Sequence, residues 1–67
     1  MVHVGDQFET GELCPQSGIF LFSRYLDGTA FPVPREKECR VDLVEGTPFP
    51  LIFSSAKHCI WKLIKLE

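Results

Sequence analysis

The sequence lacks any long hydrophobic run. No stretch approaches the length of a membrane-spanning helix, about 20 apolar residues. The amino-terminal residues 1–6 have no basic stretch followed by an apolar segment, as a secretory signal would. The net charge is -2, so the chain has no general attraction for phosphate backbones or anionic lipids. These absences favour a soluble, cytoplasmic protein that does not bind membranes.

Closely spaced cysteine pairs are also missing. Cys14, Cys39 and Cys59 are widely separated and odd in number, so a closed set of disulfides within the chain is excluded. Structural zinc sites usually contain cysteines separated by about two to four residues. His58 and Cys59 would point to opposite faces of a strand, so both cannot reach one ion without a bend. We expect reduced cysteines that act as small buried hydrophobes, with no metal and no other cofactor.

The sequence shows no catalytic apparatus. A Cys or Ser nucleophile needs a base within hydrogen-bond reach, and neither His3 nor His58 lies in a local pattern of that kind. The carboxylates are spread along predicted turns and solvent faces, where a solvated charge is the ordinary explanation. A chain of 67 residues also has little volume for a pocket that buries a substrate. We expect no enzymatic activity and no small-molecule substrate.

Aromatic residues supply most of the bulk that the chain can use for a core. It contains six Phe, one Trp and one Tyr, and 45% of its residues are hydrophobic. At this size folding buries only about 60% of the surface of the extended chain, so each large apolar side chain matters for stability. We expect a single β domain over residues 1–67, with residues 1–7 frayed. Leu66-Glu67 cannot be told from residues left by an expression vector, and no prediction rests on them.

The clearest predicted strand is Ile19–Leu26, which is rich in β-branched and aromatic residues. Asp27-Gly28 follows it and predicts a hairpin turn of type I′, because both central positions of that turn need positive φ. The returning segment Thr29–Pro34 contains two prolines, which cannot donate to a β-ladder. We therefore predict a short edge strand or an extended loop there.

Two further strands follow from the pattern. Residues from Glu38 to Glu45 alternate apolar and charged side chains, as a strand with one buried face does. Residues from Lys57 to Leu66 fit either a strand or a short amphipathic helix behind a Ser55 N-cap, and we favour the strand. Together these segments predict a mostly β fold, a single small antiparallel sheet or a partly open barrel of about four to five short strands.

A faint internal repeat relates residues 8–15 to residues 43–50. Each copy has an apolar residue, a glycine three positions later and a proline four positions after that. Each copy then leads into an apolar segment with aromatic residues. The repeat predicts two similar units packed face to face, each with a glycine turn and a proline-held extended approach.

A longer pattern runs through most of the chain. In order, it contains Phe8, Gly11-Glu12, Cys14-Pro15, Ser17-Gly18-Ile19-Phe20, Val41, Leu43, Gly46, Phe49-Pro50 and Trp61. It resembles small bacterial YjzC-like proteins of unknown function, in which a phrase FxxGxxxPxSGxY precedes a glycine turn and a later Val-Leu strand leads to Gly, Phe-Pro and Trp. This chain has Phe20 where the aromatic is often Tyr, and an extra Pro48. The resemblance implies a bacterial setting and brings no established reaction or cofactor.

Two functions remain after these exclusions. We favour a non-catalytic protein-interaction or structural module that docks on a partner or on a second copy, because a thin domain with exposed strand edges gains stability when apolar surface is covered. Its candidate surface is Phe31, Phe49 and Trp61. The alternative is single-stranded nucleic-acid binding through aromatic platforms beside cations. The residues for that function are Phe20, Phe22, Arg24 and Tyr25 on one predicted strand and Lys57, Trp61, Lys62 and Lys65 on another.

Overall fold

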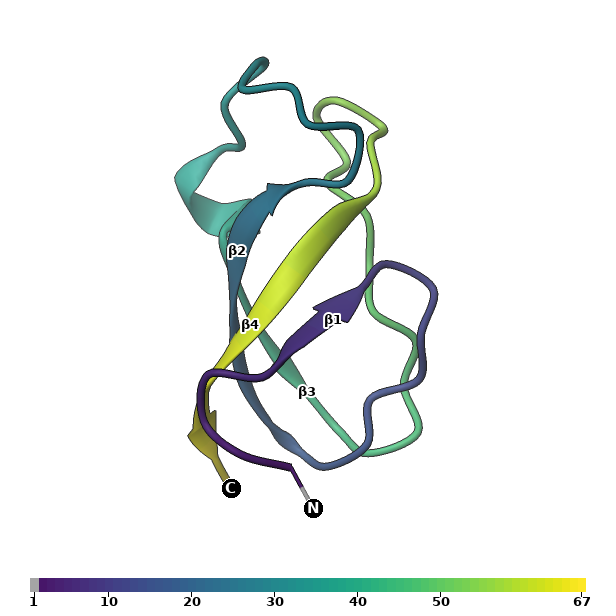
Figure 1. Cartoon of the computed structure of the whole chain (residues 1–67), viewed down its shortest axis with the longest axis vertical. Helices are drawn as coiled ribbons and strands as arrows, with labels where there is room; N and C mark the ends of the chain where they lie inside the picture. Colours follow the sequence, from purple (N-terminus) through teal and green to yellow (C-terminus); the bar gives the residue numbers. More distant parts are fainter. Residues whose placement is uncertain (1) are drawn as a thin grey trace.

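The fold is one open antiparallel sheet of four strands, known from a computed structural model that describes residues 2–67. Figure 1 shows the elements in chain order: β1 (Gln7–Glu9), β2 (Gly18–Tyr25), a single 3₁₀ turn η1 (Glu36–Glu38), β3 (Arg40–Leu43) and β4 (Cys59–Leu66). The strand order across the sheet is β1-β4-β2-β3. The predicted mostly β class and single antiparallel sheet are therefore confirmed.

The strand order has an internal symmetry that matches the sequence repeat. Strands β2 and β4 pair at the centre, β1 joins β4, and β3 joins β2. Exchanging the pair β1–β2 with the pair β3–β4 leaves this order unchanged, so the strand order is symmetric between the two units. Each unit thus completes the sheet of the other.

The two copies of the repeat lie side by side and hydrogen-bond to each other. Their four backbone bonds run from Gly11 to Phe49 (3.0 Å), from Phe49 to Glu12 (2.9 Å), from Cys14 to Thr47 (2.8 Å) and from Gly46 to Cys14 (2.8 Å). Gly11 and Gly46 occupy the same position in the two copies and have φ of 95° and 90°, a left-handed conformation that side chains disfavour. The repeat is therefore a matched pair of turns that meet edge to edge.

Strand β4 shows why the carboxyl-terminal segment is a strand. Cys59, Trp61 and Leu63 point inward and are buried, while Lys62 between them is exposed. As a central strand, β4 supplies side chains to the core along its whole length, which a short helix could not do. The strand prediction for Lys57–Leu66 is confirmed from Cys59 onward, and the helical alternative is wrong. Leu66 belongs to this strand and pairs with Gly18.

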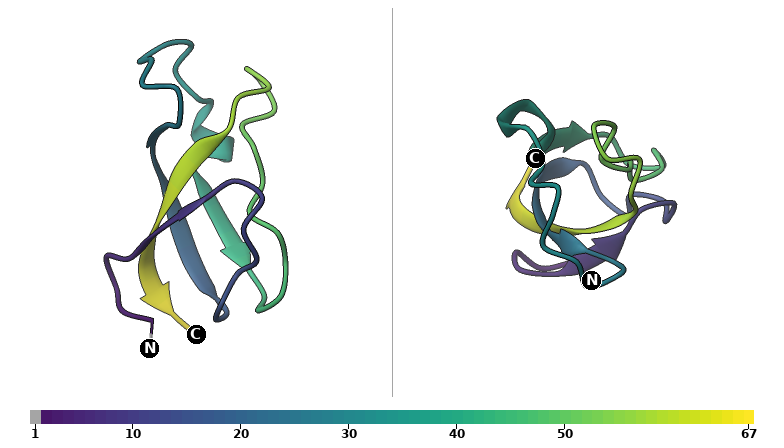
Figure 2. Two further views of the ribbon diagram at one scale, coloured as in Figure 1. Left: turned by 45° about the vertical axis from the view of Figure 1, so that its right-hand side comes forward. Right: turned by 90° about the horizontal axis from the view of Figure 1, so that it is seen from above.

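The core lies on the concave face of the sheet. Figure 2 shows the strands curving around it, with the segment after β3 on the side that the strands leave open. Phe49 from that segment lies between two rings of the sheet, 4.9 Å edge-on from Phe20 and 5.2 Å in a stack with Phe8. The indole Nε1 of Trp61 donates to the carbonyl of Pro50 at 2.8 Å. Aromatic packing thus closes the open side.

The expected hairpin at Asp27-Gly28 does not form. Gly28 has a φ of 81° and bonds to the carbonyl of Tyr25, but Asp27 does not adopt positive φ, so the turn is not type I′. The Asp27 carboxylate instead accepts from the amide (3.0 Å) and hydroxyl (2.6 Å) of Thr29. The chain then continues as an extended loop through Thr29–Pro34, the second of the two predicted alternatives. The strand that pairs with β2 begins only at Arg40.

The amino-terminal segment bonds to β4 through its backbone. The amide of Gly5 donates to the carbonyl of Leu63 at 2.8 Å, and the amide of Leu63 donates to Asp6 at 2.9 Å. Residues 5 and 6 thus have backbone partners on β4, the predicted fraying of residues 1–7 stays a prediction, and Met1 lies outside the described residues. Both ends of the chain lie at the same end of the molecule (Figure 1). Over residues 2–67, no helix has the length and apolarity to cross a membrane.

Candidate functional site

The three residues of the predicted interaction surface do not lie on one surface, because one is exposed and two are buried in the core. Phe31 is 73% exposed, as expected for a surface anchor. Phe49 and Trp61 retain only 2% and 1% exposure, so they are core residues and the prediction is wrong for them. The physical reason is that so small a chain needs its largest side chains inside. Prolines next to Phe49 do not expose it, since they hold the chain extended against the core.

The aromatic platform that nucleic-acid stacking requires is not on the surface. Phe20, Tyr25 and Trp61 are buried on the concave face, while Lys62 and Lys65 are exposed. Neighbouring residues of a strand point to opposite faces, which separates Lys62 from the indole of Trp61, and a shift of register after Leu63 leaves Lys65 exposed as well. Lys62 and Lys65 therefore do not share a surface with the buried rings of Phe20 and Trp61.

The cysteines and histidines do not converge. Cys14 and Cys59 are buried, and Cys39 is half-buried beside η1. Burial raises the pKa of the Cys59 thiol, opposed in part by its contact with the Thr10 hydroxyl at 3.6 Å. In the part of the chain that the structure describes, no three His, Cys, Asp or Glu residues are grouped so that they could hold a metal ion.

An apolar hollow lies beside β3, where the sheet curves away from the segment after it. Its volume is about 240 Å³. Five apolar residues and two charged residues of η1 line it: Val41, Pro50, Leu51, Phe53, Trp61, Lys37 and Glu38. A second hollow of about 370 Å³ continues from it along η1 and shares Lys37, Glu38 and Phe53. We call the first of these the β3 hollow.

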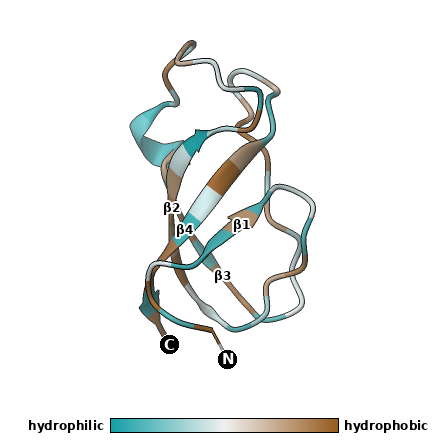
Figure 3. Cartoon of the chain, in the orientation of Figure 1, coloured by the Kyte–Doolittle hydropathy of each residue, from teal (hydrophilic) through white to brown (hydrophobic). Residues whose placement is uncertain are grey.

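The wall of the β3 hollow is held by one carboxylate. Glu38 accepts from the amide of Ser54 at 2.9 Å and from the amide of Arg35 at 3.2 Å, so it links η1 to the loop that carries Phe53. The hydrogen bonds with Ser54 are the main reason that the pKa of Glu38 lies below its usual value. Phe53 itself is 82% exposed, the most exposed large apolar side chain among residues 2–67. Figure 3 shows η1 itself as a hydrophilic segment.

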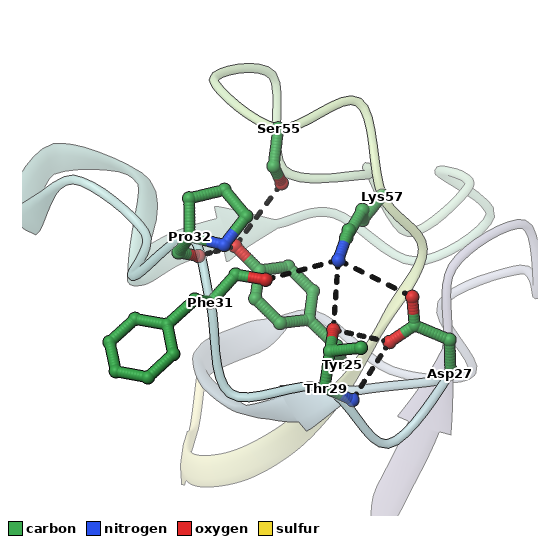
Figure 4. A network of polar contacts seen from close by, with 7 residues as sticks. All are labelled: Tyr25, Asp27, Thr29, Phe31, Pro32, Ser55 and Lys57. Atoms are coloured by element: carbon green, nitrogen blue, oxygen red, sulfur yellow. Dashed lines mark hydrogen bonds and ion pairs between the residues drawn. The ribbon is translucent and has the colours of Figure 1, made fainter.

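A third hollow, of about 390 Å³, lies elsewhere, between Leu26-Asp27 and Ala56–His58. The charged groups there serve a structural network, drawn in Figure 4. The Lys57 amine donates to the Thr29 hydroxyl at 2.8 Å and to the Phe31 carbonyl at 3.0 Å, and lies 3.4 Å from Asp27. Hydrogen bonds from Thr29, with a smaller effect of Lys57, lower the pKa of Asp27. These polar groups hold one another in place.

The same network fixes the loop that carries Phe31. Tyr25 donates its hydroxyl to the carbonyl of Pro32 and accepts from the hydroxyl of Ser55 at 3.1 Å. The Lys57 amine also lies 5.2 Å from the centroid of the Tyr25 ring, within the range of a cation–π contact. Figure 4 shows the Phe31 ring pointing away from these contacts. Phe31 is thus presented outward on a fixed loop.

The outer edge of β3 adjoins the β3 hollow and has no backbone partner among residues 2–67. The amide of Phe22 donates to the carbonyl of Cys39 at 2.8 Å, and Phe20 lies opposite Val41. In an antiparallel pair this bond directs the backbone groups of residues 39, 41 and 43 toward β2 and those of Arg40 and Asp42 away from it. No backbone or side-chain group of residues 2–67 bonds to those outward groups.

Sequence reasoning missed both the β3 hollow and the free edge. The alternation at Glu38–Glu45 identified the strand, but a pattern along one segment does not say whether a strand is central or at an edge. The β3 hollow needs Val41 and Phe53 to meet, and no local signal pairs them. The sequence did suggest that an exposed strand edge binds a partner. That argument was applied to Phe49 and Trp61 and not to Phe53.

Comparison with known proteins gives no further identification. No protein-family model, no curated protein and no solved structure matches this chain. The candidate site therefore rests on the geometry of the chain itself: an unpaired strand edge beside an apolar hollow.

Proposed function

We propose that this chain is a non-catalytic protein-interaction module that binds an extended polypeptide segment along the free edge of β3. The observation that carries the proposal is the unpaired backbone of Arg40 and Asp42 directly beside the β3 hollow. Extended peptides commonly bind in this way: the backbone of the peptide pairs with an exposed edge, and alternate side chains enter apolar depressions next to it. An edge and a depression together supply affinity and selectivity.

The exposed aromatic at the hollow supports the same reading. Phe53 is 82% exposed, although the chain has few large apolar residues from which to build a core. A bound segment would cover the Phe53 ring and the half-buried Val41 together. Aromatic residues of this kind are enriched at protein interfaces, where their burial on binding contributes most of the affinity.

The setting of this module is also part of the proposal. The resemblance to YjzC-like proteins, carried by the residues from Phe8 to Trp61, supports a bacterial origin. Three cysteines that are unpaired in the structure suit a reducing compartment, so we propose the bacterial cytoplasm. A role without catalysis is supported by the engagement of Asp27 and Lys57 in the loop network.

Single-stranded nucleic-acid binding is the second candidate. It would rest on cations of the convex face, where Arg24, Lys62 and Lys65 are exposed. Ion pairs do not engage these three: among residues 2–67 the salt bridge is that of Lys57 with Asp27. Without aromatic stacking such binding would be weak and strongly salt-dependent, so we rank it below the protein partner.

Site-specific photo-crosslinking tests the proposal. Phe53 is replaced by the photoreactive residue p-benzoylphenylalanine, and the matched control carries it at Leu13, which is also exposed but lies outside the β3 hollow. Irradiation of cells should give a discrete product at position 53 and none at position 13. The partner identified by mass spectrometry, mixed with the purified chain, should slow amide exchange at Arg40 and Asp42. No product at position 53, or one without such protection, overturns the proposal.

A further inference from the structure

We infer that the segment bound at the β3 edge is β3 of a second copy of this chain, which makes the protein a symmetric dimer. This inference rests on the proposed function and names its partner. Two four-stranded sheets joined through β3 would form one continuous antiparallel sheet. The evidence lies in the direction of the backbone groups, in the charges along the edge and in the apolar face beneath it.

The backbone groups of β3 suit pairing with themselves. Arg40 and Asp42 both direct their amide and carbonyl groups away from β2, as the bond between Phe22 and Cys39 establishes. When two antiparallel copies of β3 are centred on Val41, Arg40 lies opposite Asp42 of the partner subunit, and each outward donor meets an outward acceptor. By symmetry the second such pair forms as well. The interface is thus self-complementary, as a two-fold contact requires.

The charges select this register among those that the backbone allows. With the centre on Val41, the two cross-strand pairs on the convex face each join Arg40 to the partner subunit's Asp42. Shifting the centre by one residue in either direction places Arg40 opposite the partner's Arg40, or Asp42 opposite the partner's Asp42. Directly opposed like charges on neighbouring strands are destabilising, whereas opposite charges are favourable. One register is therefore favoured over both of its neighbours.

The concave face of the same register is apolar. Val41 points toward the core side, is half-buried and lines the β3 hollow with Trp61 beneath. In the dimer, Val41 faces the partner's Val41 in a close, non-hydrogen-bonded pair. Phe53, which stands exposed at the same hollow, would be covered by the second copy. The dimer thus combines edge pairing with burial of the largest exposed side chain at this site.

Charge reversal tests the register. The purified chain is measured by sedimentation velocity over a wide range of concentration, together with Asp42→Arg and Arg40→Asp. The native chain should dimerise, and each single variant should weaken dimerisation by about tenfold or more, because both symmetric pairs then join like charges. An equimolar mixture of the two variants should form a heterodimer, since every opposed pair again has opposite charges. Glu9→Arg, on the outer strand β1, is the matched control and should dimerise like the native chain.

A second measurement needs no substitution. Amide exchange of the native chain should slow at Arg40 and Asp42 as the concentration rises, while the amides of Gln7 and Glu9 on the opposite edge stay unchanged. Circular dichroism of each variant shows that it is folded. Two results overturn the dimer: a native chain that stays monomeric at millimolar concentration, or variants whose mixture does not associate.

The two proposals fail in different ways. A crosslink from position 53 to another protein, together with a monomeric native chain, overturns the dimer and leaves the protein-interaction module intact. Absence of any crosslink from position 53 overturns the use of the β3 hollow, even where the charge-reversal series shows self-association through the strand edge.

Discussion

The two edge strands of the sheet, β1 and β3, hold equivalent places in the strand order, but their side-chain packing and backbone contacts differ. On β1 the ring of Phe8 packs into the core, 5.2 Å from Phe49 and 5.9 Å from Phe20. The carbonyl of Glu9 already accepts from the amide of Glu12 at 3.1 Å. Its outward side chains, Gln7 and Glu9, offer no pair of opposite charges for a second copy. Phe8 thus anchors β1 to the core and the turn occupies the carbonyl of Glu9, while no bond within residues 2–67 occupies the outward backbone groups of Gln7.

The β3 edge differs in each of these respects. The core-facing residues of β3, Val41 and Leu43, are smaller than Phe8, and Val41 borders the β3 hollow. Arg40 and Asp42 carry opposite charges at positions whose backbone is unpaired. Exposed edges invite association, and proteins usually protect them with charged side chains, prolines or bulges. The contrast indicates that β1 is anchored by a core aromatic, whereas β3 presents opposite charges and an apolar hollow beside its free backbone.

The largest expected effect is on stability. It compares the loss of one core-facing side chain on each edge strand. Phe8→Ala removes a ring that contacts two core aromatics, so we expect a loss of about 3 kcal/mol in the free energy of unfolding. Val41→Ala removes less buried surface and should cost about 1 kcal/mol. Urea denaturation followed by circular dichroism measures both. Equal losses of unfolding free energy would contradict the claim that Phe8 anchors β1 more strongly than Val41 anchors β3.

The next effect on stability concerns Gly18, the first residue of β2, which pairs with β3 on one side and with β4 on the other. A Cβ at Gly18 would lie 2.6 Å from the carbonyl oxygen of Lys65 and 3.0 Å from Leu63 Cδ1, so the backbone must shift. We expect Gly18→Ala to cost about 2 kcal/mol. Gly18 pairs with Leu43 and Leu66, so amide exchange should accelerate in β3 more than in β1. Ser23→Ala, an exposed change within β2, is the control and should leave exchange unaltered.

A smaller effect is expected in the loop that leads to β3. Tyr25→Phe removes the hydroxyl that bonds Pro32 and Ser55, and we expect a loss of about 1 kcal/mol. The main consequence is local, because the loop loses one of its two anchors while Lys57 remains. Trypsin should cleave after Arg35 several times faster in the variant than in the native chain. A cleavage rate that does not change would show that Lys57 alone fixes the loop.

Local patterns in the sequence predicted the strands well and their partners poorly. Alternation identified β3, and the aromatic and β-branched content of Ile19–Leu26 and Lys57–Leu66 identified β2 and β4. Pairing depends on contacts between distant segments, which such patterns do not contain. The hairpin at Asp27-Gly28 failed for this reason: its turn signal is local, but the residues that follow include Pro32 and Pro34, which cannot pair with β2.

Burial was predicted correctly where a strand alternates and wrongly where proline was taken as a sign of exposure. Phe49, flanked by two prolines, was assigned to the surface, and the structure places it at the centre of the core. Phe53 was left out of the candidate surface, although it is far more exposed. A chain of 67 residues has few ways to fill a core, and the choice between its aromatics depends on which of them the sheet encloses.

The smallest expected effect is a pH dependence at the β3 hollow. The pKa of Glu38 is lowered by its hydrogen bonds with Ser54, so the folded state holds the carboxylate more strongly than the unfolded chain does. The stabilisation is therefore complete above the ordinary glutamate pKa of about 4 and is lost as the pH falls through the lower value of the folded protein. Glu38→Gln should show a flatter stability curve between about pH 5 and pH 3. Lys37→Gln, in the same turn, retains the carboxylate and should keep the native slope. Thermal unfolding of the three proteins across this range measures the difference, and identical slopes for Glu38→Gln and the native chain would show that this carboxylate does not hold the wall of the hollow.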